Sequence, residues 1–283
     1  MSKMPFLPLK EPDEMSPFHS LFQKKKLVFL DLDGTIYMGN ALIPGAKEFL
    51  DCLKDQGIYF YFLSNNSSRS KSDYVKKLSA LGIYTDEGGI ILSTDGVIAF
   101  LLDEDIRDIY VVGTKSMKDM FSEAGFHLES SDPRFVILGF DTELTYEKLK
   151  TAALYIQNGV ELIATHPDLV CPTPEGFIPD TGAMLALFEK ATNKKPFKIF
   201  GKPNPEMITH ILKKHNISPE NVVMIGDRIY TDMELARRVP CDSILVLSGE
   251  TKKENLASIE KQPTLVVDSV ADLIPQTKNS QTS

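Results

Sequence analysis

The chain has 283 residues, which is long enough to bury a large apolar core and predicts two domains. Its 31 Lys and Arg against 39 Asp and Glu give a net charge of −8, which disfavours a nucleic-acid binder because such proteins present a basic face. With 42% hydrophobic and 25% charged residues, the composition is that of an ordinary soluble globular protein.

The cysteines and the apolar runs bear on the cellular compartment. Cys52, Cys171 and Cys241 are odd in number and far apart, so we expect free thiols rather than disulfides or a zinc site. The longest apolar runs have the length of strands, too short for a membrane span, and no signal-peptide pattern precedes the first of them. We therefore expect a cytoplasmic protein with no membrane contact.

The first hundred residues predict alternating strands and helices. Residues 1–24 show no periodicity and are interpreted as an irregular lead-in. Strands are expected at Leu27–Leu30 and Ile58–Leu63, and helices at Gly45–Gln56 and Lys71–Leu81. This alternation is typical of a parallel sheet wrapped by helices.

The middle of the chain, residues 102–196, repeats the pattern with elements of its own. Its expected strands and helices are Asp108–Val112, Lys115–Ala124, Arg134–Gly139, Tyr146–Gln157 and Glu161–Ala164. Because the strands on either side carry matching chemical groups, we interpret this segment as a smaller α/β cap. It would be inserted into a doubly wound, Rossmann-like α/β core made of residues 25–101 and 197–275.

The last third predicts three more strands, followed by a frayed tail at 276–283. These strands are expected at Phe197–Phe200, Asn221–Ile225 and Ser243–Leu247. Asn204-Pro205 and Ser218-Pro219 each predict the start of a helix, because an N-cap residue precedes a proline in the first turn.

Reactive or phosphate-binding residues follow four of the expected strands. In chain order they are Asp31 and Asp33, then Ser64, Asn65 and Asn66, then Gly201-Lys202, and finally Gly226-Asp227. If the four strands share one parallel sheet, these residues meet at the edge where open α/β sheets bind ligands. Acids that lie side by side repel each other, and a cation or a shared chemical task would offset that cost.

This set of groups favours phosphoryl transfer. Mg²⁺ prefers oxygen ligands and takes one or two carboxylates, which Asp31 and Asp227 could supply together with the carbonyl of Asp33. Lys202 and Ser64 would then hold the phosphoryl oxygens, over which charge spreads during in-line transfer. One of the two leading acids can be the nucleophile and the other the proton donor, because carboxylates form aspartyl phosphates.

Four motifs in this order resemble the haloacid dehalogenase-like (HAD) phosphatase superfamily. They are Asp-x-Asp-Gly-Thr at Asp31–Thr35, Ser64-Asn65, Gly-Lys-Pro-x-Pro at Gly201–Pro205, and Gly-Asp-Arg-x-x-Thr-Asp at Gly226–Asp232. The chain is most similar to the NagD-like, 4-nitrophenylphosphatase-type branch with an inserted α/β cap. Two cap segments, Ala164–Asp168 and Pro179–Gly182, extend this resemblance, which covers roughly residues 25–275.

The resemblance implies a role for each motif residue. Asp31 would be the nucleophile and Asp33 the general acid and base, with Ser64 and Lys202 on the phosphoryl group. Mg²⁺ would be bound by Asp31, the Asp33 carbonyl and Asp227, with Asp232 orienting this shell. Further candidates for substrate binding in or beside the motifs are Gly34, Thr35, Asn65, Asn66 and Asn204.

Cap residues 165–180 face the active site in the resembled family. His166, Asp168 and Glu175 are therefore candidates for recognising the leaving group, although a structural turn explains each of them equally well. Relatives often carry Asn where this chain has His166. For Arg228 we favour a structural ion pair over a contact with substrate.

We expect a Mg²⁺-dependent phosphatase that hydrolyses sugar phosphates, nucleoside monophosphates or aryl phosphates. A phosphotransferase or phosphomutase using the same aspartyl phosphate is an alternative, as is a non-catalytic binding protein on this scaffold. A dehalogenase would leave Lys202 and the metal aspartates without a role. Each motif alone also has a structural explanation, so the interpretation depends on their combination. The expected partner is a small phosphorylated metabolite, with a homodimer through the cap.

Overall fold

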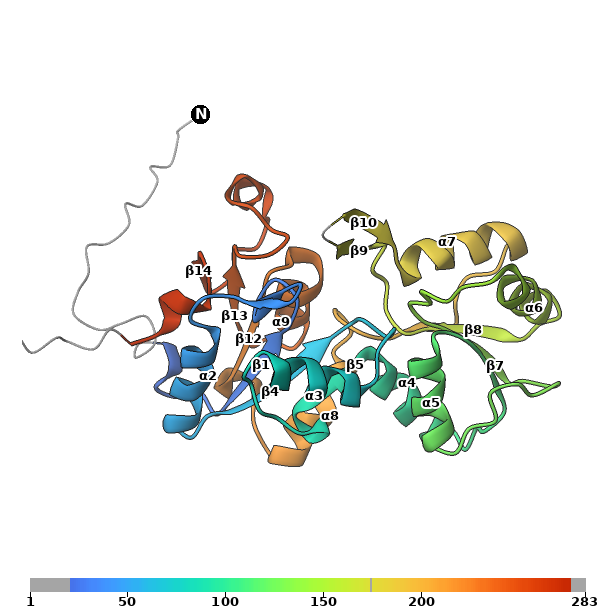
Figure 1. Ribbon diagram of the computed structural model, residues 1–283, viewed down its shortest axis with the longest axis horizontal. Coiled ribbons are helices and arrows are strands. Elements are labelled where there is room, and N and C mark those ends of the chain that lie inside the picture. The colour runs from blue at the N-terminus through green and yellow to red at the C-terminus, as the bar shows by residue number, and fades with distance from the viewer. Residues whose placement is uncertain (1–20, 174, 276–283) are drawn as a thin grey trace, which may run out of the picture.

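The computed structural model describes residues 21–173 and 175–275, arranged around two separate parallel sheets with helices on both faces of each (Figure 1). The six-stranded sheet lies on the left of this view and the four-stranded sheet on the right. The predicted α/β class with a core and a smaller cap is confirmed. The lead-in expected at 1–20 and the tail expected at 276–283 lie outside the described residues.

The six-stranded core sheet has β1 near its centre. Its strands are β1 (Leu27–Asp31), β4 (Tyr59–Ser64), β5 (Ile90–Leu92), β12 (Val222–Gly226), β13 (Asp242–Val246) and β14 (Leu265–Val267). The order is β14-β13-β12-β1-β4-β5, and every neighbouring pair is parallel. The early strands extend the sheet from β1 in one direction and the late strands in the other. The carboxyl end of β1 is therefore the switch point at which such sheets bind ligands.

Helices cover both faces of the core sheet. They are α2 (Ala46–Asp55), α3 (Lys71–Ala80), α8 (Glu206–His215) and α9 (Glu234–Arg238). Since successive strand residues point to opposite faces, Val28 and Leu30 pack with α2 and α3, whereas Leu27 and Phe29 pack with α8 and α9. All five positions of β1 are consequently buried, which explains its unbroken apolar run.

The four-stranded cap sheet is built in the same way. Its elements are α4 (Ser93–Asp103), β6 (Ile109–Val112), α5 (Lys115–Glu123), β7 (Phe135–Leu138), α6 (Tyr146–Gln157), β8 (Glu161–Ala164), α7 (Thr181–Thr192) and β11 (Lys198–Ile199). The strand order is β11-β8-β7-β6, all parallel. Helices α4 and α5 share one apolar cluster with this sheet, and α6 and α7 share the other.

Short elements complete the described chain. Two hairpins pair β2 (Tyr37–Met38) with β3 (Ala41–Leu42) and β9 (Val170–Thr173) with β10 (Gly176–Pro179). Short helical segments are η1 (Glu87–Gly89), η2 (Pro219–Asn221), η3 (Ile229–Met233), η4 (Lys253–Ser258) and η5 (Val270–Leu273). In Figure 1 the β9–β10 hairpin projects from the cap toward the core.

Two expectations about individual elements are wrong. The strand expected at 197–200 in the core sheet is β11, which pairs with β8 of the cap. The apolar cluster of the cap also includes Leu101 and Phe200, so it extends past both expected limits, 102 and 196. Ser218-Pro219 begins a single 3₁₀ turn instead of a helix, because the buried strand β12 begins three residues after Pro219, at Val222.

The core loop 65–68 contacts the carboxyl end of every strand in the four-stranded cap sheet. The contacts are Thr114 Oγ1 to the Ser68 carbonyl at 2.8 Å after β6, Phe140 N to Ser67 Oγ at 2.8 Å after β7, Thr165 Oγ1 to Ser67 Oγ at 3.0 Å after β8, and Lys202 N to Asn65 Oδ1 at 2.7 Å after β11. The carboxyl edges of both sheets therefore meet at this loop. Among the described residues, no helix has the length and apolarity required to cross a bilayer.

The position of β1 gives a stability prediction. Phe29→Ala should lower the free energy of unfolding by about 3–5 kcal/mol, because it opens a cavity under α8 and α9. Tyr84→Ala is the control, since Tyr84 is 76% exposed, and should change stability by about 0.5 kcal/mol or less. Urea denaturation followed by circular dichroism measures both. Equal losses in the two variants would contradict the central position of β1.

Candidate active site

The ammonium of Lys202 lies between two carboxylates from the core. The Lys202 side chain leaves the cap after β11 and is 2% exposed. Its Nζ contacts Asp31 Oδ1 at the end of β1 and lies 2.7 Å from Asp232 Oδ1 on η3. The structure thus brings together three of the residues that the sequence separates by up to 201 positions (232 − 31).

Electrostatics hold Lys202 in its charged form. Burial opposes the ammonium, but Asp232 and then Asp31 outweigh it and raise the pKa of Lys202 above its ordinary value. A buried cation next to Asp31 would keep this carboxylate from being repelled by an incoming phosphate. The arrangement therefore favours attack on an anionic substrate.

Three acids crowd the same point. Asp31, Asp227 and Asp232 each place one carboxylate oxygen within 4.8 Å of the others. Burial and then the charge of Asp232 raise the pKa of Asp227 to about 7, and burial raises the pKa of Asp31 well above its usual range despite Lys202. Asp227 Oδ1 is buried and has no hydrogen-bond partner among the described residues. An oxygen-preferring divalent cation fits this site, because it would supply that partner and offset the repulsion.

Two glycines make room for Asp227. Gly34 has a φ of +87°, and a Cβ on it would stand 2.6 Å from Asp227 Oδ2. Gly249 also lies against this carboxylate, and the next residue, Glu250, donates its backbone N–H to Asp227 Oδ2 at 2.6 Å. The glycine of the first motif therefore lets the Asp227 carboxylate approach the end of β1.

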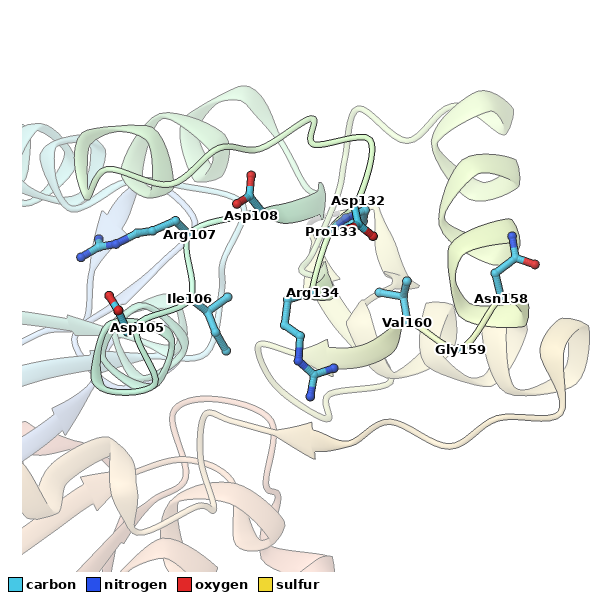
Figure 2. Close-up of a pocket in the computed structure, with 10 residues that line it drawn as sticks. All are labelled: Asp105, Ile106, Arg107, Asp108, Asp132, Pro133, Arg134, Asn158, Gly159 and Val160. Carbon is cyan, nitrogen blue, oxygen red and sulfur yellow. The ribbon is translucent and has the colours of Figure 1, made fainter.

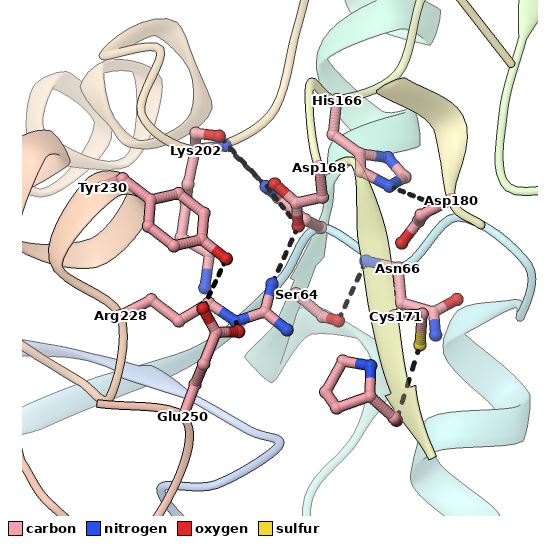
Figure 3. Close-up of polar contacts among 12 residues, drawn as sticks. Ser64, Asn66, His166, Asp168, Cys171, Asp180, Lys202, Arg228, Tyr230 and Glu250 are labelled. Carbon is pink, nitrogen blue, oxygen red and sulfur yellow. Dashed lines mark hydrogen bonds and ion pairs between the residues drawn. The ribbon is translucent and has the colours of Figure 1, made fainter. Parts of the chain in front are cut away.

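The other motif side chains differ in their exposure and in their hydrogen-bond partners. Asp33 is open, with 48% of its side chain exposed, and lies within reach of solvent and substrate. Ser64 Oγ lies 3.0 Å from Tyr74 Oη. It also accepts the N–H of Asn66 at 3.2 Å, as Figure 3 shows. Thr35 is buried, and its Oγ1 has no partner within the described chain.

A small cavity of about 70 Å³ opens over these groups. Its walls come from both domains and consist of Asp31, Asp33, Ser64, Asn65, Asn66, Asp168, Cys171, Pro172, Asp180, Lys202, Arg228 and Thr231. A larger hollow of about 500 Å³ lies at the opposite, amino edge of the cap sheet (Figure 2). That hollow contains none of the motif residues, and Arg134 on its wall is paired with Glu161 at 3.2 Å. The chemistry belongs to the smaller cavity.

Five of the residues predicted to bind substrate do not line the cavity in the described part of the chain: Gly34, Thr35, His166, Glu175 and Asn204. His166 is fully buried, with Nδ1 2.9 Å from Thr165 Oγ1. Its Nε2 lies 2.9 Å from Asp180 Oδ1 (Figure 3). Glu175 is exposed in the β9–β10 turn. The side-chain Oδ1 of Asn204 accepts the backbone N–H of Glu206, the first residue of α8, at 3.0 Å. The partners of the buried His166 are not revealed by a turn-like sequence pattern, whereas Asn204 lies at the helix start that Asn204-Pro205 predicts.

Asn65 and Asp168 line the cavity, but their side chains also join the two domains. Asn65 Nδ2 donates to Asp168 Oδ1 at 3.1 Å and to the Lys202 carbonyl at 3.0 Å. Arg228 donates from Nη1 to Asp168 Oδ2 at 3.1 Å, and its Nε lies 3.0 Å from Glu250 (Figure 3). Arg228 therefore makes an ion pair that connects the core to the cap, and it also lines the cavity.

Sequence reasoning missed four cavity residues: Cys171, Pro172, Asp180 and Thr231. Asp180 and Thr231 stand in the quoted motifs, so position within a motif was the available signal. No sequence signal marks Cys171, because a lone cysteine in a hairpin resembles any small apolar residue. Burial raises its pKa to about 11, so the thiol stays neutral and is a poor nucleophile.

The bridge between Arg228 and Asp168 can be measured with a double-mutant cycle. Arg228→Ala, Asp168→Ala and the double variant should show a coupling of about 1–3 kcal/mol in the free energy of unfolding, since both charges are largely buried. Chemical denaturation of the four proteins gives this value. Additive losses would mean that Arg228 does not depend on Asp168 and would support a role toward substrate instead.

Comparison with known proteins agrees with this geometry. The model of the haloacid dehalogenase-like hydrolase family matches residues 28–127, and a HAD-hydrolase-like model matches residues 199–273. The dihydroxyacetone phosphatase of Corynebacterium glutamicum is 34% identical over 245 residues, which cover 86% of this chain and 88% of that protein. The ribonucleotide monophosphatase NagD of Escherichia coli is 32% identical over 248 residues, which cover 88% and 98%.

A solved structure, the 4-nitrophenylphosphatase of Thermotoga maritima, superposes with a TM-score of 0.87 at 40% identity. The match covers 90% of this chain and 98% of that one. Family models on both halves of the core, relatives above 30% identity and this shared architecture lead to one conclusion. The chain belongs to the haloacid dehalogenase-like hydrolase family and is similar to its NagD and 4-nitrophenylphosphatase members.

Proposed function

We propose that this protein is a Mg²⁺-dependent phosphatase that hydrolyses small phosphomonoesters through an aspartyl phosphate on Asp31. The observation that carries the proposal is the buried ammonium of Lys202 against Asp31, beside the group of three acids. Relatives named as phosphatases of dihydroxyacetone phosphate, ribonucleotides and nitrophenyl phosphate support the reaction class.

The first half-reaction transfers the phosphoryl group to the enzyme. Asp31 attacks phosphorus through the oxygen not held by Lys202, and the bond between phosphorus and the leaving oxygen breaks. Asp33 gives its proton to that oxygen, so that the product leaves as an alcohol. Lys202 and Ser64 hold the phosphoryl oxygens, on which charge develops.

The second half-reaction restores Asp31. Asp33, now a carboxylate, accepts a proton from water as the water oxygen bonds to phosphorus, and inorganic phosphate departs. Asp31, the Asp33 carbonyl and Asp227 would hold Mg²⁺, with Asp232 orienting them. When bound, this ion supplies positive charge to the phosphoryl oxygens. The relatives named as phosphatases favour water as acceptor over a sugar, and thus a hydrolase over a phosphotransferase or mutase.

The substrates would be small phosphorylated metabolites, that is, sugar phosphates, nucleoside monophosphates or aryl phosphates. The small cavity supports this class, because it admits a phosphoryl group between core and cap and leaves the rest of a ligand toward the β9–β10 hairpin. A cytoplasmic location and a homodimer through the cap stay predictions.

The nucleophile is tested with Asp31→Asn. This variant should lose at least about a thousandfold in kcat with 4-nitrophenyl phosphate, since an amide cannot form the phosphoryl enzyme. The matched control is Asp55→Asn, which removes a charge from the exposed last residue of α2 and should keep wild-type activity. Circular dichroism checks that both variants fold. Near-wild-type turnover by a folded Asp31→Asn protein would disprove the role of Asp31.

The cation is tested by removal and return. Because the three buried acids repel one another, EDTA should abolish activity and lower the melting temperature, and added Mg²⁺ should restore both. Differential scanning fluorimetry beside the phosphatase assay provides the two readouts. Full activity in metal-free buffer would contradict the assignment of the acid group as a Mg²⁺ site.

A further inference from the structure

Tyr37 and Lys77 lie on either side of the Asp33 carboxyl, and neither has a role in the reaction steps above. We call this pair the bracket of Asp33. Tyr37, in the β2–β3 hairpin, donates its hydroxyl to Asp33 Oδ2 at 3.2 Å. Lys77, on α3, places its Nζ 4.0 Å from Asp33 Oδ1. The same Nζ lies 3.6 Å from the centre of the Tyr37 ring. Each oxygen of the Asp33 carboxyl thus has its own neighbour.

The Tyr37 side of this bracket is rigid. Its side chain is fully buried. Two backbone hydrogen bonds tie Tyr37 to the loop that carries Asp33, from Gly34 N to the Tyr37 carbonyl at 2.8 Å and from Tyr37 N to the Leu32 carbonyl at 3.2 Å. The hydroxyl of Tyr37 is therefore held in place relative to Asp33.

Lys77 is unusual for a lysine on the surface of a helix, because such side chains normally extend their ammonium into water. Only 19% of its side chain is exposed. Burial lowers the pKa of Lys77, and the charge of Asp33 partly offsets this. A desolvated ammonium is stabilised by the face of an aromatic ring and by a carboxylate, and Lys77 contacts one of each. Its position therefore depends on both Tyr37 and Asp33.

We infer that Tyr37 and Lys77 are positioning residues that hold the Asp33 carboxyl at the cavity wall for proton transfer to the leaving group. The inference rests on the proposed role of Asp33 as proton donor. Without the bracket, the half-exposed Asp33 side chain samples other rotamers and meets the leaving oxygen less often. The loss should appear only where the leaving group needs a proton.

Two aryl esters of nearly equal size separate these cases. Phenyl phosphate releases a basic phenolate and needs proton donation, whereas 4-nitrophenyl phosphate releases a stabilised anion and does not. The value of kcat/KM reports the first half-reaction. Tyr37→Phe and Lys77→Met should each lower kcat/KM for phenyl phosphate by about ten- to a hundredfold and leave that for 4-nitrophenyl phosphate within about threefold.

The controls separate this inference from the function on which it rests. Lys76→Met alters the exposed neighbour of Lys77 on α3 and should leave both values unchanged. Lys77→Arg should recover part of the loss, because it restores the cation. Asp33→Asn should show the largest selective loss, about a hundred- to ten-thousandfold on phenyl phosphate.

The ratio of the two kcat/KM values does not depend on which fraction of a variant is folded, because both substrates are tested on the same sample. If Asp33→Asn lowers kcat/KM equally for both substrates, the proposed proton donor is wrong. If Asp33→Asn is selective but Tyr37→Phe and Lys77→Met are not, the donor stands and the positioning role is overturned. An equal loss of kcat/KM for both substrates in the Tyr37 and Lys77 variants also overturns the positioning role.

Discussion

The ion pair of Lys202 with Asp31 and Asp232 is the contact on which the rest of the site depends. Without the ammonium, no cationic side chain in the described part of the chain would pair with Asp31 or Asp232. A buried group of like charges is tolerated only when opposite charge is close and well placed. Lys202 provides part of that charge permanently, and the remaining acid, Asp227, has an orphaned oxygen suited to a metal ion.

The origin of Lys202 gives the cap a direct part in the core chemistry. The lysine follows β11, the last strand of the cap sheet, and its backbone is held by the side chain of Asn65 in the core. The Asp168 carboxylate of the cap contacts the same Asn65 and also Arg228. A movement of the cap relative to the core would therefore strain the contacts that place Lys202 against the nucleophile. The loop 65–68, which resembles an ordinary polar turn, contacts the end of every cap strand.

Much of this could be predicted from the sequence because the chemistry follows strand ends. Buried strands such as β1 produce continuous apolar runs, and the residue after each run stands at one edge of a sheet, which located Asp31, Ser64 and Asp227. That β11 belongs to the cap sheet and not to the core sheet could not be predicted, because a strand of two half-buried residues has no pattern that assigns it to either. His166 and Asp33 contact side chains of other elements, Asp180 and Lys77, and spacing along the chain carries no information about such contacts.

The central claim is that Asp31 carries the phosphoryl group during turnover, and borohydride trapping tests it most directly. Borohydride reduces an acyl phosphate to an alcohol, which converts a phosphorylated aspartate to homoserine. Enzyme quenched with borohydride during steady-state hydrolysis should contain homoserine at position 31, as seen by peptide mass spectrometry, and enzyme treated without substrate should not. Homoserine at another position, or none while hydrolysis proceeds at the normal rate, would contradict the account.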